Sequence, residues 1–126
     1  MNEAHEYRLP FCSLNRLSDK IVEVRIDEGI EISLAMVTEL HRQLLVIMGS
    51  SFGVLVDKVH SYSMSFEAQQ AVAALPEIVA TAALVYNSAG EMATQQVQVM
   101  REDQEKPLAI FHDRDGAVKW LQAKVA

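Results

Sequence analysis

A continuous apolar run that ends in an acid constrains the fold of this chain more than any other stretch of its sequence. The residues from Phe52 to Val56 are apolar on both faces of an extended chain, and Asp57 ends the run. A strand with this pattern is buried from both sides, as in sheets covered by helices. A serine-rich loop and a helical pattern follow. We therefore expect a central strand that delivers its loop to the carboxyl edge of a sheet, where open α/β folds place their binding sites.

Strand and helix patterns alternate along the rest of the chain. Residues 7–15 alternate, and Pro10 confines that strand to an edge of the sheet. A turn at 15–19 and a second alternating strand at 21–26 predict an antiparallel pair. Further strands are predicted at 78–86 and 108–111, and helices at 34–48, 66–75, 88–100 and 114–125. The small alanines of 78–86 allow a helix or another chain to pack closely.

The order of these elements predicts the fold class. It is an α/β domain with a mixed five-stranded sheet, antiparallel at the edge and otherwise mostly parallel, and about four helices. A length of 126 residues corresponds to a single domain, residues 1–126, with residues 1–6 expected to be flexible. Ser33, Ser65 and Asp113 stand where N-caps belong, and Ser88 with Glu91 has the spacing of a capping box.

Charge and hydropathy exclude several partners. The net charge is −6, and the Lys and Arg residues are scattered singly, so we expect neither nucleic acid nor an anionic membrane as a partner. No apolar run approaches the roughly 18 residues of a membrane span. The polar, acidic N-terminus is unlike a signal peptide. These features predict a cytoplasmic protein without membrane insertion.

The sequence contains no motif for a cofactor or a metal. The five glycines are too dispersed for a phosphate-binding loop, and the four histidines have no paired ligand at helical spacing. No nucleophile elbow occurs. Cys12 lacks basic neighbours in the sequence and is interpreted as a small apolar filler. His41, beside the apolar stripe of its helix, is interpreted as a half-buried, hydrogen-bonded residue rather than a ligand.

The candidate functional residues lie in two loops. The first loop follows the central strand, and the second leads into the helix that Ser88 is expected to cap. Their members are Asp57, His60, Ser61, Tyr62, Ser63 and Ser65 in the first loop, and Asn87 and Ser88 in the second. For Ser65 the N-cap interpretation is favoured over phosphorylation, although a helix N-terminus suits a phosphate. An enzyme would have to be assembled from Asp57, His60, Tyr62 and the serines of this first loop.

These motifs resemble a STAS domain, the family of bacterial anti-sigma-factor antagonists, which has the SpoIIAA-like fold. Val54-Leu-Val-Asp57 matches the family's central strand with its terminal acid, and Ser65 falls close to the regulatory serine. The family's Asp-Ser-x-Gly pattern is absent, because Met64 precedes Ser65 and Phe66 follows it. The segments Pro107 to Asp113 and Ala117 to Leu121 are similar to the C-terminal signature of small uncharacterised bacterial STAS-like proteins. The resemblance implies the fold and non-enzymatic partner binding.

Three functions stay open at this point. The first is a regulatory or protein-interaction module that uses residues 57–66 and 87–88. The second is a module that binds a small molecule or a lipid in an apolar pocket. The third is a hydrolase-like enzyme. Right-handed crossovers that progress in one direction leave the second face of the apolar strands in need of a cover. Either one of the helices or a second subunit can provide it, and we predict a homodimer.

Overall fold

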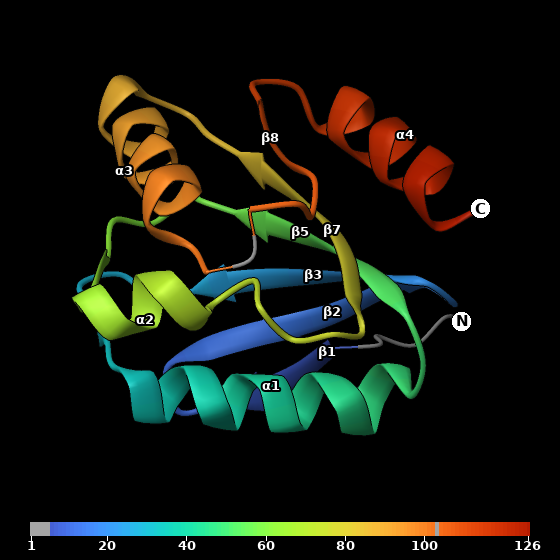
Figure 1. Ribbon diagram of the computed structural model, residues 1–126, viewed down its shortest axis with the longest axis horizontal. Helices are drawn as coiled ribbons and strands as arrows, with labels where there is room; N and C mark the ends of the chain where they lie inside the picture. Colours follow the sequence, from blue (N-terminus) through green and yellow to red (C-terminus); the bar gives the residue numbers. More distant parts are fainter. Residues whose placement is uncertain (1–5, 103) are drawn as a thin grey trace.

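The computed structural model describes residues 6–102 and 104–126 as an α/β structure built on a six-stranded sheet (Figure 1). The strand order is β1-β2-β3-β5-β7-β8, and a separate two-stranded sheet joins β4 to β6. The strands are β1 (Glu6–Leu9), β2 (Cys12–Ser18), β3 (Ile21–Ile26), β4 (Glu31–Ile32), β5 (Phe52–Asp57), β6 (Ser63–Met64), β7 (Ile78–Leu84) and β8 (Leu108–Phe111). The helices are α1 (Leu34–Met48), α2 (Phe66–Ala71), α3 (Ser88–Met100) and α4 (Arg114–Val125).

The predicted fold class is confirmed, with one more strand in the main sheet than expected. β1, β2 and β3 pair antiparallel, and β3, β5, β7 and β8 pair parallel. The single edge strand expected at 7–15 is a hairpin, because the chain turns at Pro10 and Phe11 and pairs Leu9 with Cys12. The turn expected at 15–19 is also wrong, since β2 stays paired with β3 as far as Ser18.

The small sheet of β4 and β6 carries no periodic signal in the sequence, since each strand has two residues. It pairs Glu31 with Ser63 and Ile32 with Met64 in parallel. Gly29, with a φ of 79°, lies just before β4 and adopts a backbone conformation that favours glycine. The segment that follows the central strand is therefore tied to the segment that precedes α1.

Helices cover both faces of the main sheet. α1, α2 and α3 lie on one face, and α4 packs on β7, β5 and β8 from the other (Figure 1). Gly53 permits this approach, because a Cβ there would lie 3.1 Å from side-chain atoms of both Leu121 and Val125. Trp120 packs beside Phe111 of β8, with ring centroids 5.5 Å apart. The face for which the sequence suggested a second subunit is thus covered by α4, and dimerisation stays a prediction.

Three of the four predicted N-caps are confirmed. The side chains of Ser33, Ser65 and Asp113 each accept a hydrogen bond from the backbone N–H three residues later. At α3 the cap is Asn87, whose side chain accepts from the Gly90 N–H at 2.8 Å, so the prediction of Ser88 is wrong. Asn and Ser are comparable caps, and the extended backbone at Asn87 decides between them.

Two further predicted boundaries change. α2 ends at Ala71 instead of Leu75. Just after this end, the backbone carbonyl of Val72 accepts a hydrogen bond of 2.9 Å from the side chain of His41. Of the segment expected to be flexible, residues 1–5 lie outside the described residues, and Glu6 begins β1.

Candidate functional site

A largely apolar pocket lies between the main sheet and the helices of its first face. The sheet contributes residues of β3, β5 and β7, and α1 and α3 form the two sides. The rest of the lining comes from β4, β6, the residues just after α2, the loop after β5, Phe11, and Leu108 of β8. The pocket holds about 780 Å³ of empty space, its opening to solvent included. Its lining is mostly apolar, as in many small-molecule sites.

Small side chains on β7 create part of this space. Ala83 and Thr81 line the pocket, whereas Ala80 and Ala82 of the same strand belong to the core under α4. α3 lies at the opposite wall and buries only Thr94 and Val97 fully. The alternation of β7 therefore provides close packing on one face and a hollow on the other.

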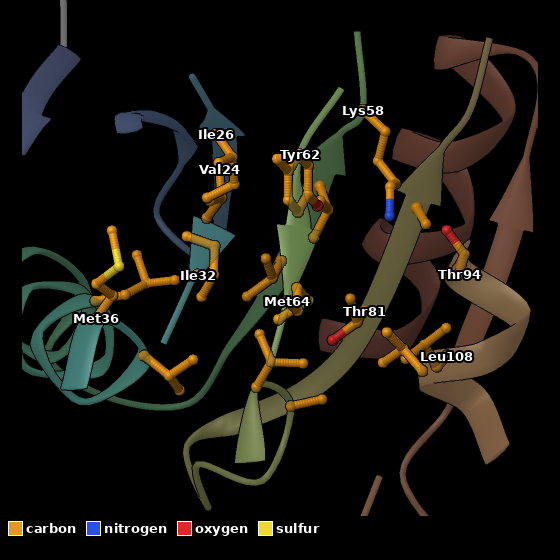
Figure 2. Close-up of a pocket in the computed structure, with 18 of the residues that line it drawn as sticks. Val24, Ile26, Ile32, Met36, Lys58, Tyr62, Met64, Thr81, Thr94 and Leu108 are labelled. Carbon is orange, nitrogen blue, oxygen red and sulfur yellow. The ribbon is translucent and has the colours of Figure 1, made fainter. Parts of the chain in front are cut away.

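Lys58 supplies the only charged side chain among the described residues that line this pocket. The backbone N–H of Lys58 donates to the carbonyl of Leu84, so strand pairing continues one residue past β5. Alternation then puts Lys58 on the same face as Val54 and Val56. Figure 2 shows Lys58 extending its amine end into the pocket.

Tyr62 is the neighbour of the Lys58 amine. The Lys58 Nζ lies 4.9 Å from the centroid of the Tyr62 ring, in a cation–π contact. Within the part of the chain that the structure describes, no carboxylate lies within ion-pair distance of this amine. Burial lowers the pKa of Lys58 to about 8 and raises the pKa of Tyr62 above its ordinary range.

The predicted loop after the central strand is firmly attached to residues 28–32. Ser61 donates its backbone N–H to Glu28 Oε1 at 2.9 Å, and its carbonyl accepts from Gly29 at 2.7 Å. The His60 Nδ1 lies 3.7 Å from the same Glu28 carboxylate. The side chains of His60, Ser61 and Ser63 lie at the surface, whereas Tyr62 turns into the pocket.

Asp57 lies on the opposite face of the sheet, in a cluster of four charges. Its Oδ2 is 2.9 Å from Arg25 Nη2 and 3.7 Å from Arg114 Nη1. Glu23, also buried, accepts two hydrogen bonds of 3.0 Å from Arg114. Burial raises the pKa of the Asp57 carboxyl, but the Tyr86 hydroxyl and Arg25 outweigh burial and hold that pKa below its ordinary value.

The structure therefore does not bring Asp57, His60 and Tyr62 together. Asp57 joins β5 to the start of α4, Tyr62 lines the pocket, and His60 lies beside Glu28 at the surface. Ser65 has its hydroxyl committed to the N-cap of α2, and Asn87 has its side chain committed to α3. Ser88 is exposed in the first turn of α3.

The remaining candidate side chains have structural surroundings. His41 is half-buried and hydrogen-bonded to Val72, as predicted. Cys12 is fully buried, and burial raises its thiol pKa to about 12. Over residues 6–102 and 104–126, no three His, Cys, Asp or Glu side chains converge as a metal site. Nor does any helix in those ranges have the length and apolar character needed to cross a membrane.

Sequence reasoning missed Lys58. The direction of its side chain could have been predicted, because Lys58 lies two residues after Val56 and alternation along β5 puts both side chains on one face. The sequence could not show that Lys58 lacks an acidic partner, because this depends on which segments the fold brings to the pocket.

The topology and the covered sheet define a protein of the SpoIIAA-like fold. A solved structure with this fold is similar over nearly the whole chain: an uncharacterized protein of the DUF3478 family from Shewanella loihica PV-4. The TM-score is 0.58 at 14% sequence identity, with 96% of this chain and 97% of that chain covered. The STAS-like resemblance seen in the sequence is thereby confirmed for the fold.

The chain belongs to the family described as "Domain of unknown function (DUF7793)", whose model matches residues 15–124. The search of curated proteins gave no match.

Proposed function

We propose that this protein is a non-enzymatic binding module that holds an apolar small molecule in the pocket between the sheet and α1 and α3. The observation that carries the proposal is the lining itself. Sixteen of the twenty lining residues are aliphatic, aromatic or methionine side chains, and the polar exceptions are Lys58, Tyr62, Thr81 and Thr94. A concave apolar surface with a few polar groups is the usual form of a small-molecule site.

The positions of the other candidate residues also favour binding over catalysis. A general acid–base site needs its groups within hydrogen-bond reach of one reacting atom. Asp57 faces α4, Tyr62 faces the pocket, and His60 lies beside Glu28, so these three cannot act on one substrate atom in this arrangement.

Filling the pocket tests the proposal. Ala83→Leu adds three carbon atoms to a wall residue that is buried on the pocket side of β7. Ala123→Leu makes the same change at an exposed position of α4 and serves as the matched control. We expect a hydrophobic fluorophore to bind the wild type and Ala123→Leu equally, and Ala83→Leu at least about tenfold more weakly. Native mass spectrometry of the purified protein would show any ligand retained from the cell.

Equal binding by Ala83→Leu and the wild type would contradict the proposal. Thermal unfolding of both variants separates loss of the pocket from loss of the fold.

A protein-interaction function is the second candidate. Three exposed apolar side chains follow the carboxyl ends of β5 and β7, close in sequence to the predicted loops: Val59, Tyr86 and Met92. Exposed apolar residues that form one contiguous patch are frequent in interaction sites. Alanine at His60, Ser61 and Ser63 would test this function, and an unchanged set of binding partners in a pull-down would count against it.

A further inference from the structure

The Lys58 amine and the Tyr62 hydroxyl are hydrogen-bond donors in the pocket that lack an acceptor among the described residues. The Lys58 Nζ has three N–H groups, and its contact is the face of the Tyr62 ring. The Tyr62 hydroxyl makes no hydrogen bond with any other residue in the described ranges. Both side chains are largely withdrawn from solvent, and apart from Thr81 and Thr94 the surrounding walls are apolar.

A cation in apolar surroundings without a carboxylate partner costs free energy, which a bound group with acceptor oxygens would offset. Structural lysines at a surface avoid this cost by extending the amine into water. Lys58 instead directs its amine toward the walls of the pocket (Figure 2). The pairing of its backbone N–H with Leu84 fixes this direction, because it continues the alternation of β5.

We propose that Lys58 is the anion-recognition residue of this pocket and that its ligands are apolar molecules with one terminal carboxylate. This inference rests on the proposed function and specifies its ligand class. The aliphatic part of the ligand lies along Val54, Val56 and Leu40, and the carboxylate lies at the Lys58 amine, with the Tyr62 hydroxyl as a second donor.

The hydrogen-bond donors of the pocket determine which head group of a ligand can bind. A carboxylate offers only acceptors, which complements the three N–H groups of Lys58 and the hydroxyl of Tyr62. No arginine lines the pocket within the described residues, so Lys58 offers one positive charge, which the single negative charge of a carboxylate balances. A cationic head group would meet the charge of Lys58 directly, and a neutral one would leave that charge unpaired.

The test compares ligands that share one chain and differ in the head group. Dodecanoate, dodecan-1-ol and dodecyltrimethylammonium are titrated by isothermal calorimetry below their micelle-forming concentrations. We expect the wild type to bind dodecanoate about ten- to hundredfold more tightly than the alcohol, as charge-assisted hydrogen bonds generally provide. The quaternary amine should bind most weakly.

The variants separate charge from shape. Lys58→Met keeps the length of the side chain and removes the charge, so its affinity for dodecanoate should fall to its affinity for dodecan-1-ol. Lys58→Arg should retain the preference for the acid. Since Lys58→Met also removes an unpaired charge, its melting temperature should equal or exceed that of the wild type. If Lys58→Met does not fold, Lys58→Gln gives the same comparison.

The two proposals fail in different ways. Equal affinities for acid and alcohol in the wild type, or a preference that survives in the uncharged variant, would overturn the role of Lys58 and leave the binding function standing. If neither the acid nor the alcohol binds the wild type, the proposed function itself fails.

Discussion

Arg114, the first residue of α4, donates two hydrogen bonds of 3.0 Å to the carboxylate of Glu23, which is buried in β3. The two residues are 91 positions apart in the sequence. This pair, with Arg25 and Asp57, fixes the start of α4 against the sheet. The cluster stands at the carboxyl edge of β5 but on the face opposite the pocket, so we assign it to stability.

Removing Arg114 tests that assignment. Arg114→Met leaves the carboxylate of Glu23 buried without its main partner, and breaking a buried ion pair costs about 3–5 kcal/mol. Arg114 is itself half-exposed, so we expect a loss of about 3 kcal/mol in the free energy of unfolding, measured with urea. Arg42→Met breaks the exposed pair with Glu39 and should cost less than about 1 kcal/mol. Similar losses in the two variants would contradict a structural role for the cluster.

His41 makes the stability depend on pH. Burial lowers the pKa of His41 in the folded protein, with a smaller contribution from Lys106, so the unfolded state binds the proton more readily. The stability that this neutral histidine confers is present above its unfolded pKa of 6.5 and is lost as the pH falls through the folded pKa. The titration of one proton cannot change the free energy of unfolding by more than about 1.4 kcal/mol per pH unit.

The measurement is urea unfolding of the wild type and His41→Gln at several pH values between about 7.5 and 5. Glutamine can still donate a hydrogen bond toward Val72 but does not titrate in this range. We expect the slope of stability against pH to become smaller in the variant. An identical slope would show that the pH dependence arises elsewhere.

A side chain at Gly53 should crowd the contact between β5 and α4. Gly53→Ala would place a methyl group 3.1 Å from atoms of Leu121 and Val125, and crowding of this kind in a core costs about 1–3 kcal/mol. Gly90→Ala is the control, because its nearest neighbour would be 3.5 Å away and alanine favours a helix by about 0.5–1 kcal/mol over glycine. Opposite shifts in melting temperature are therefore expected. A neutral Gly53→Ala would mean that α4 packs less closely on β5.

Ser65 should contribute to stability through its N-cap. Ser65→Ala removes the acceptor for the Ala68 N–H, which is 3.1 Å from the hydroxyl, and loss of an N-cap costs about 1 kcal/mol. Ser63→Ala changes an exposed serine of the neighbouring strand β6 and should have an effect below about 0.5 kcal/mol. Chemical denaturation of the two variants gives the comparison. Equal stabilities would contradict the importance of the cap.

Much of the fold was predictable because it follows from local patterns. The apolar run from Phe52 to Val56 predicted a strand covered on both faces, and the structure buries that strand between α1 and α4. The stripe from Val37 to Met48 predicted α1 with the correct cap and end. Hydrophobic periodicity and capping are properties of neighbouring residues, so one sequence is sufficient to detect them.

The hairpin of β1 and β2 and the pairing of β4 with β6 were not predictable to the same extent. Strands of two residues have no measurable period, and their pairing partners lie about thirty residues away. The sequence also could not decide between Asn87 and Ser88 as the N-cap of α3. Both side chains can cap a helix, and the extended backbone of Asn87 decides in its favour.

The sequence alone determined the α/β class, the order of most elements, the central strand with Asp57 at its end, and the polar loop that follows it. The tertiary structure decided what those residues do. Asp57 and Lys58 are adjacent in the chain, yet Asp57 joins the charged cluster under α4 and Lys58 enters the pocket. The physical reason is that consecutive side chains of a strand point to opposite faces, and the surroundings of each face are assembled from distant segments.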